Sequence, residues 1–213
     1  NLYEVHYEDE YSTKSNLKLK PESIKTAELI WEQRLTNNIL GVVSVYDYRI
    51  KDLIDQVVDP SDGLAQHRNI GKAKANGIEL ELNANWKNGL QWYASYSFQN
   101  AKDLDLKTRL TDSPVNMIKA GISLPVAKYF YVTPEIVYET ERKTVYETKT
   151  EPYLLTNINI STRSVFDRIR LSFLIRNMFD EYYKYPGWFE HEQDSIAQDG
   201  RNFTLKIECK FQT

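Results

Sequence analysis

The stretch Gly77-Ile78-Glu79-Leu80-Glu81-Leu82-Asn83-Ala84-Asn85-Trp86 alternates apolar and polar side chains without a break. A period of two is typical of a β-strand that has one dry face and one wet face. The final stretch, from Phe203 to Phe211, repeats the pattern, with five apolar residues separated by Thr, Lys, Glu and Lys. Repeated along a chain, this pattern indicates a sheet with two different faces and favours a membrane β-barrel.

Nine strands are expected, and most exceed the roughly 9–11 residues that cross a bilayer. Strands of soluble proteins usually have about 5–6 residues, so strand length is a second indication of a barrel. Pro134 falls inside the sixth strand, where we expect a bulge or a break in pairing. The expected ranges are 22–35, 40–58, 67–86, 90–103, 114–126, 129–142, 153–165, 169–183 and 201–212.

The expected connections alternate strictly between short and long. The short ones cover 36–39, 87–89, 127–128 and 166–168, and the long polar ones cover 59–66, 104–113, 143–152 and 184–200. Outer-membrane barrels have short turns on the periplasmic side and long loops outside, whereas a soluble sandwich has no reason to sort its loops this way. Bacterial barrels have even strand counts, so an odd count predicts further strands upstream.

Composition narrows the function classes. The 213 residues carry 27 basic and 30 acidic side chains, a net charge of −3, so no nucleic-acid partner is expected. No apolar run approaches the roughly 20 residues of a transmembrane helix. The single cysteine, Cys209, excludes an internal disulfide framework and a cysteine metal cage. Fifteen Tyr and four Trp fit either a membrane interface or a general preference of aromatic residues for strands.

Four segments, in this order, resemble the C-terminal part of a TonB-dependent outer-membrane receptor. They are Asn1-Leu2-Tyr3-Glu4 with Asn16-Leu17-Lys18-Leu19-Lys20-Pro21-Glu22, the set Asn69, Gly71, Ala73, Gly77, Glu79 and Glu81, the run Arg176-Asn177-Met178-Phe179-Asp180-Glu181-Tyr182-Tyr183, and Pro186-Gly187 with Gly200-Arg201. The resemblance covers essentially the whole chain.

The resemblance implies an all-β antiparallel meander, with residues 1–213 forming the last part of a 22-stranded barrel. The plug domain, the early strands and the region that contacts the TonB complex would lie upstream. The intact protein would bind a ferric siderophore or a related chelate in the bacterial outer membrane and import it with energy relayed by TonB. Haem and cobalamin receptors share the same wall. Outer-membrane lipid would be the remaining partner, and no cofactor is expected.

Ligand capture is expected in the long loops, because a rigid scaffold positions them. The candidates are Tyr185, Trp188, Phe189 and His191 in the longest loop, with Lys107 and Arg109 as cations for an anionic chelate. The alternative for Tyr185 and Trp188 is an interfacial aromatic belt. The polar row Glu79, Glu81, Asn83 and Asn85 is expected to face the lumen, because a basic charge facing lipid near the midplane costs about 2–4 kcal/mol.

No catalytic or metal site is expected. The three histidines, His6, His67 and His191, accompany no nucleophile elbow, although His67 and His191 fall at expected outer ends. The acidic stretch around His191 could hold a cation through oxygen atoms, but a solvated loop is the better interpretation. Two other classes stay open: a small outer-membrane barrel with catalysis at its rim, and a β-rich adhesion fragment.

Overall fold

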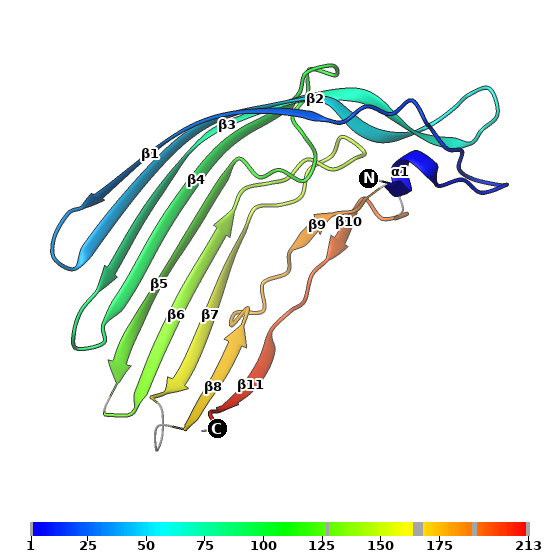
Figure 1. Cartoon of the computed structure of the whole chain (residues 1–213). Coiled ribbons are helices and arrows are strands. Elements are labelled where there is room, and N and C mark those ends of the chain that lie inside the picture. The colour runs from blue at the N-terminus through cyan, green and yellow to red at the C-terminus, as the bar shows by residue number, and fades with distance from the viewer. Residues whose placement is uncertain (1, 127, 164–167, 189–190, 212–213) are drawn as a thin grey trace. The chain divides into compact units, whose positions relative to one another are not determined.

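The computed structural model describes residues 2–126, 128–163, 168–188 and 191–211. Nine strands form one antiparallel sheet in the order β1-β2-β3-β4-β5-β6-β7-β8-β11, and β9 and β10 form a separate ribbon (Figure 1). The nine-strand meander predicted from the sequence is confirmed. The strands are β1 (Ser23–Arg34), β2 (Ile39–Val58), β3 (Ala65–Asn85), β4 (Gln91–Asp103), β5 (Asn116–Val126), β6 (Phe130–Glu139), β7 (Tyr153–Thr162), β8 (Ile169–Arg176), β9 (Lys184–Pro186), β10 (Ser195–Ala197) and β11 (Asn202–Cys209).

The chain divides into two compact units, which we describe separately. The first contains Asn1–Glu28, Tyr46–Asn76 and Asn100–Leu110, and so includes the short helix α1 (Leu2–His6). The second contains Leu29–Val45, Gly77–Gln99 and Thr111–Thr213. Within the described residues, no helix is both long enough and apolar enough to span a membrane.

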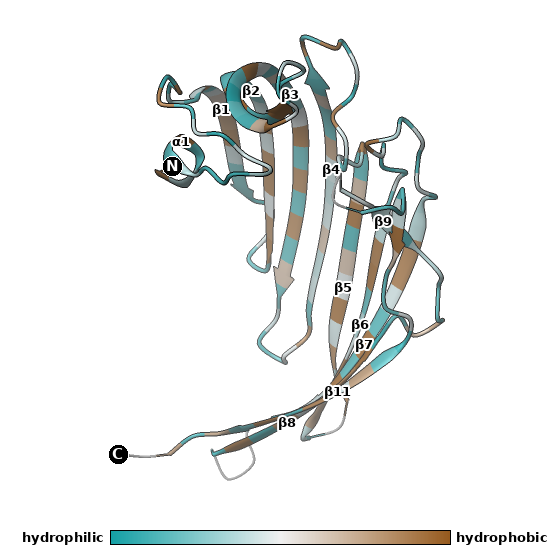
Figure 2. Cartoon of the chain, turned by 90° about the vertical axis from the view of Figure 1, so that its right-hand side faces the viewer, coloured by the Kyte–Doolittle hydropathy of each residue, from teal (hydrophilic) through white to brown (hydrophobic). Residues whose placement is uncertain are grey.

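Strand pairing in the second unit aligns apolar residues into continuous rows. Leu124 pairs with Val132, Val132 with Ile160, Ile160 with Phe173, and Phe173 with Leu205, so this row crosses five strands. Leu124, Ile160 and Phe173 are each more than a third exposed, and Leu205 is 67% exposed. Figure 2 shows the same alternation as bands of hydrophobic and hydrophilic residues along the strands. An exposed apolar row of this length needs a covering that the described chain does not supply.

The opposite face of the same strands carries polar rows. Tyr131 pairs with Ser161, Ser161 with Ser172, and Ser172 with Lys206. The Ser172 hydroxyl donates to Asn159 Oδ1 at 2.6 Å on this face. Because side chains alternate between faces along each strand, the register fixes one apolar face and one polar face for the whole run from β5 to β11.

Burial confirms that the sheet lacks an ordinary core. Among the described residues, the buried apolar side chains are three alanines and one tyrosine: Ala73, Ala84, Ala101 and Tyr153. A soluble sheet would bury its large aliphatic residues against a second layer. Here those residues lie on the exposed face, as in a strand wall whose apolar side contacts lipid.

Pro134 interrupts the pairing of β6 with β5, as expected, but without a bulge. The pairing of β5 with β6 stops at Gly121 with Glu135 and resumes at Leu124 with Val132 in the same register. On its other side, Pro134 pairs with Ile158 in an unbroken ladder. Proline lacks a backbone N–H, so hydrogen bonds are lost on the side of β5 only. The continuous pairing with β7 keeps β6 in place.

The eighth strand ends earlier than the sequence predicted, and the loop that follows contains additional structure. β8 stops at Arg176 instead of extending to residue 183, because Asn177 turns into the left-handed region (φ 49°). The Asn177 side chain then accepts a hydrogen bond from Glu181 N at 2.8 Å and donates to Glu181 O at 2.9 Å. The expected loop 184–200 contains the β9–β10 ribbon. Its strands have only three residues each and no clear alternation, so the sequence did not indicate them.

Candidate functional site

The residues expected to face the lumen lie along β3, and two of them line a hollow. Asn83 and Asn85 border a space of about 770 Å³ in the second unit. Asn83 donates to Glu81 Oε1 at 2.5 Å, as two side chains on one face can, and Glu79 is exposed. Uncharged polar residues of β4 to β7 share the hollow: Gln91, Ser123, Thr133, Asn159 and Ser161. That this surface faces a lumen stays a prediction.

Tyr185, a predicted ligand residue, is part of an aromatic cluster. Its hydroxyl lies 3.2 Å from that of Tyr153, a buried residue at the start of β7. The Arg142 guanidinium stands 4.3 Å from the centre of the Tyr185 ring, a cation–π contact. Tyr183 packs on Tyr153 with ring centres 4.7 Å apart. Tyr185 therefore anchors the β9–β10 ribbon to the start of β7.

An ionic network centred on Arg142 contacts this aromatic cluster. Arg142 donates to Glu139, which is only 5% exposed, and to Asp112 Oδ1 at 2.8 Å. Burial by itself would lower the pKa of the Arg142 guanidinium, but its hydrogen bonds to Glu139 and Asp112 raise that pKa overall. Arg142 therefore remains charged and holds both the acidic pair and the ring of Tyr185.

Trp188 and His191 lie beyond β9, near the connection between β6 and β7. Trp188 is 52% exposed, and its carbonyl accepts the backbone N–H of His191 at 2.9 Å. The Tyr146 hydroxyl donates to the His191 carbonyl at 3.5 Å, and Thr148 donates to Asp194 from the same connection. Phe189, the fourth aromatic candidate, lies outside the described residues. The structure thus brings Tyr185, Trp188 and His191 into one loop region.

Lys107 and Arg109 belong to the first unit, whereas the aromatic candidates belong to the second. Both side chains are exposed in the connection between β4 and β5. Lys107 has a positive φ of 57°, and Arg109 forms an antiparallel bridge with Lys102. Their exposure suits contact with an anionic ligand, and that role stays a prediction.

Sequence reasoning missed Arg142, Glu139, Asp112 and Tyr153 as members of this region. The partners are far apart in the sequence, 30 residues for Arg142 and Asp112 and 32 for Tyr153 and Tyr185, so no local spacing connects them. Arg142 ends the expected strand 129–142, and an exposed cation at the end of a strand does not by itself indicate a site. Only the antiparallel pairing of β5, β6 and β7 brings their loop ends together.

Asp59 holds the first unit together at the end of the β2–β3 hairpin. It accepts from Lys14 Nζ at 2.8 Å and from Arg68 Nη2 at 2.5 Å, and Lys14 also reaches Asp62 at 2.7 Å. The hydrogen bond from Lys14, followed by those from Ser61, lowers the pKa of the Asp59 carboxyl well below its usual range. Salt bridges from Lys14 thereby connect the N-terminal segment to the β2–β3 hairpin.

Two residues of the family-like segments have a structural role in this unit. Asn69 Oδ1 accepts from Lys20 N, and Asn69 Nδ2 donates to the carbonyls of Lys20 and Asp52, each at 2.8 Å. Its side chain thus replaces a strand partner for Lys20. A Cβ on Gly71 would lie 3.0 Å from Leu53 Cβ, so close packing explains the glycine.

The histidines do not form a catalytic constellation around any described nucleophile. The His67 carbonyl accepts from Asn16 Nδ2 at 2.7 Å, and the His67 ring meets the Tyr3 ring edge-on at 6.4 Å. His6 ends helix α1. Across the residues with described positions, no group of three or more His, Cys, Asp or Glu is arranged to hold a metal ion.

The two-faced antiparallel sheet and its alternating connections define a segment of an outer-membrane β-barrel. The chain belongs to the family described as TonB dependent receptor-like, beta-barrel, which matches residues 3–178. This family of the bacterial outer membrane consists of transporters, not enzymes, in agreement with the expectation that the chain is not an enzyme.

Solved structures of receptors share the fold at low identity. The ferric-catecholate import receptor Fiu from K12 E. coli is 16% identical (TM-score 0.71), and the match covers 99% of this chain and 31% of that one. The FrpB iron transporter from Neisseria meningitidis is 16% identical (TM-score 0.73; 94% and 33% covered). The copper transporter OprC is 17% identical (TM-score 0.72; 91% and 32% covered). The chain spans about a third of their length, and no curated protein sequence matches it.

Proposed function

We propose that this chain is the C-terminal wall and outer loops of a TonB-dependent receptor, with the plug domain and earlier strands upstream. The observation that carries the proposal is the apolar row from Leu124 to Leu205, which crosses five strands, is more than a third exposed on four of them and is backed by a polar face. The polar face would line the lumen, where Glu79, Glu81, Asn83 and Asn85 would contact the plug and water. The upstream region would engage the TonB complex.

The proposed ligand is a ferric siderophore or a related chelate. The β9–β10 region supports this, because it presents the exposed ring of Trp188 and the exposed imidazole of His191 in one loop region. Aromatic side chains on a rigid support suit a bulky chelate. Iron receptors among the similar structures agree with this ligand class, and the copper transporter makes copper the competing cargo.

Uptake by intact cells tests the cargo. Cells with and without the receptor gene would be starved of iron and supplied with radiolabelled ferric chelates or with labelled copper. We expect gene-dependent uptake of at least one ferric chelate and none of copper. Gene-dependent copper uptake, or no dependence for any ferric chelate, would contradict the proposed cargo.

A pair of aromatic substitutions tests the binding surface. Trp188→Ala is expected to weaken ligand binding about tenfold or more, since exposed aromatic anchors often contribute over 1 kcal/mol. Tyr129→Ala is the matched control, because Tyr129 is 53% exposed but directly precedes β6, at the opposite end of that strand from the long connection between β6 and β7. Equal loss of affinity in both variants would count against binding at the β9–β10 region.

A further inference from the structure

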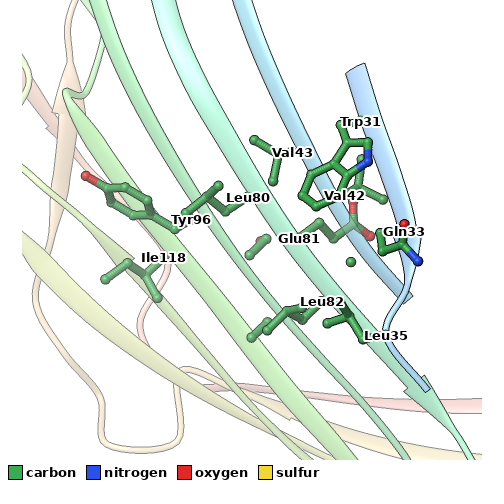
Figure 3. Close-up of a pocket in the computed structure, with 13 residues that line it drawn as sticks. Trp31, Gln33, Leu35, Val42, Val43, Leu80, Glu81, Leu82, Tyr96 and Ile118 are labelled. Carbon is green, nitrogen blue, oxygen red and sulfur yellow. The ribbon is translucent and has the colours of Figure 1, made fainter. Parts of the chain in front are cut away.

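The apolar face of the second unit has a groove over β1 to β5. Its volume is about 480 Å³, within the roughly 300–1,000 Å³ range of small-molecule sites. The groove is lined mainly by apolar side chains, including Trp31, Leu35, Leu82, Tyr96 and Ile118. Figure 3 shows Leu35 and Leu82 near each other, with Tyr96 and Ile118 further along. Glu81 is the one charged residue at its edge, and the largely apolar lining suits a hydrocarbon chain.

Gly41 lines this groove without a side chain. A Cβ at Gly41 would lie 3.4 Å from Leu35 Cδ1 and 3.4 Å from Leu82 Cδ2, so the two leucines flank an empty position on β2. An alanine would make ordinary contacts there, but a larger side chain would occupy the space between the leucines. The groove can therefore be filled by changing one residue, without altering a charge or a side-chain hydrogen bond.

The position of the groove indicates its occupant. It continues the exposed apolar face, which in this outer-membrane family is the lipid interface. Leu35 directly precedes the short turn between β1 and β2, and Gly41 follows that turn by a few residues. Short turns of outer-membrane barrels face the periplasm. We propose that the groove seats one acyl chain of a phospholipid from the periplasmic leaflet.

Photolabelling of the intact receptor tests this site. The full-length protein would be reconstituted in vesicles that contain a phospholipid with a diazirine in the acyl chain, and labelled peptides would be mapped by mass spectrometry. Labelling at Leu35 and Leu82 is expected to exceed that at Ile160 and Phe173 roughly tenfold, a preference of about 1.4 kcal/mol. Ile160 and Phe173 are the control because they lie on the same face, outside the groove.

Filling the groove provides the second arm. Gly41→Leu should reduce labelling at Leu82 to the level of the control row, whereas Thr156→Leu, which adds bulk to the apolar face elsewhere, should leave it unchanged. Uniform labelling of the unmodified receptor would overturn the proposal, and so would strong labelling of Leu82 that survives Gly41→Leu. A lipopolysaccharide probe that labels the groove in preference to the phospholipid would assign it to the other leaflet and would also overturn it. The labelling ratio of the unmodified receptor decides the question even if Gly41→Leu fails to fold.

Discussion

A single arginine on the apolar face should destabilise the barrel far more than an arginine on the next residue. Ile136 lies in the apolar row of β6, paired with Ala120 and Thr156, and is 39% exposed. β6 has ten residues. At about 3.4 Å per residue and a tilt of about 40°, it rises about 26 Å, close to the roughly 25 Å apolar band of a barrel.

The magnitude follows from the depth of this residue. Ile136 is less than two residues from the middle of β6, which places it within about 5 Å of the midplane. Arginine facing lipid there costs about 2–4 kcal/mol. The folding equilibrium of Ile136→Arg should therefore shift about 30- to 700-fold toward the unfolded state.

Val137→Arg is the matched control on the polar face. Val137 pairs with Lys119, so the new like-charge pair should cost roughly 0.2–1 kcal/mol. Both variants of the intact receptor would be unfolded in urea from lipid vesicles and followed by tryptophan fluorescence. Equal destabilisation by the two substitutions, or a cost below about 1 kcal/mol for Ile136→Arg, would refute the assignment of the apolar face to lipid.

Three further predictions concern the loop regions. Tyr153→Phe removes the hydroxyl that meets Tyr185 and should loosen the β9–β10 ribbon by about 0.5–1.5 kcal/mol, measured by hydrogen exchange of the Lys184 and Tyr185 amides. Gly187→Ala would place a Cβ 2.2 Å from Gln193 O, so the ribbon must shift, and its exchange should accelerate further. Asp59→Asn should increase proteolysis of the N-terminal segment at neutral pH, because Asp59 would lose its charged contact with Lys14.

Each of these predictions has its own control. Gly41→Ala adds a methyl group at ordinary contact distance and should leave exchange of the ribbon unchanged. Asp55→Asn changes a carboxylate that accepts a hydrogen bond from the neighbouring Gln56 N, a contact within the same strand, so proteolysis should not increase. Similar proteolysis of the Asp59→Asn and Asp55→Asn variants would show that Asp59 does not hold the N-terminal segment in place. Unchanged exchange in Tyr153→Phe would show that the Tyr153 hydroxyl does not hold the ribbon.

The acid response of the first unit follows from the depressed pKa of its carboxyls. Hydrogen bonds from Ser12 and from the backbone N–H groups of Tyr11 and Ser12 lower the pKa of Asp9 from 3.8 to about 2. A carboxyl with a depressed folded pKa stabilises the fold above its unfolded pKa, and that contribution disappears as the pH falls through the folded pKa. We expect the N-terminal segment to loosen below about pH 4, as measured by exchange-resistant amides. Loosening of the segment only above pH 4 would contradict the predicted loss of stability in acid.

The strand wall could be predicted from the sequence because its determinants are local. A period of two in Gly77–Trp86 and in Phe203–Phe211 fixes which side chains share a face, whatever the rest of the chain does. Strand ends differed by a few residues, except at β8, where the Asn177 side chain ends the strand. That hydrogen-bonded turn is encoded by one residue within an otherwise strand-like run, so periodicity could not reveal it.

The loop region was predictable only in part, because its contacts are between distant residues. Aromatic and charged composition pointed to the segment that contains Tyr185, Trp188 and His191. The cluster of Arg142 with Glu139, Asp112 and Tyr185 depends on loop ends that meet only when β5, β6 and β7 pair. Asn69 shows the converse, since the family-like segment identified the residue but not its hydrogen bonds to Lys20.

The most direct test of the central claim is electrophoresis of fractionated cell envelope, probed with antibody to this segment in boiled and unboiled samples. The account predicts an outer-membrane band about three times the length of this chain, in line with the 31% of Fiu that the chain covers, whose mobility changes on heating. A soluble band of the length of this chain, with no change on heating, would contradict the claim that it is the wall of an outer-membrane receptor.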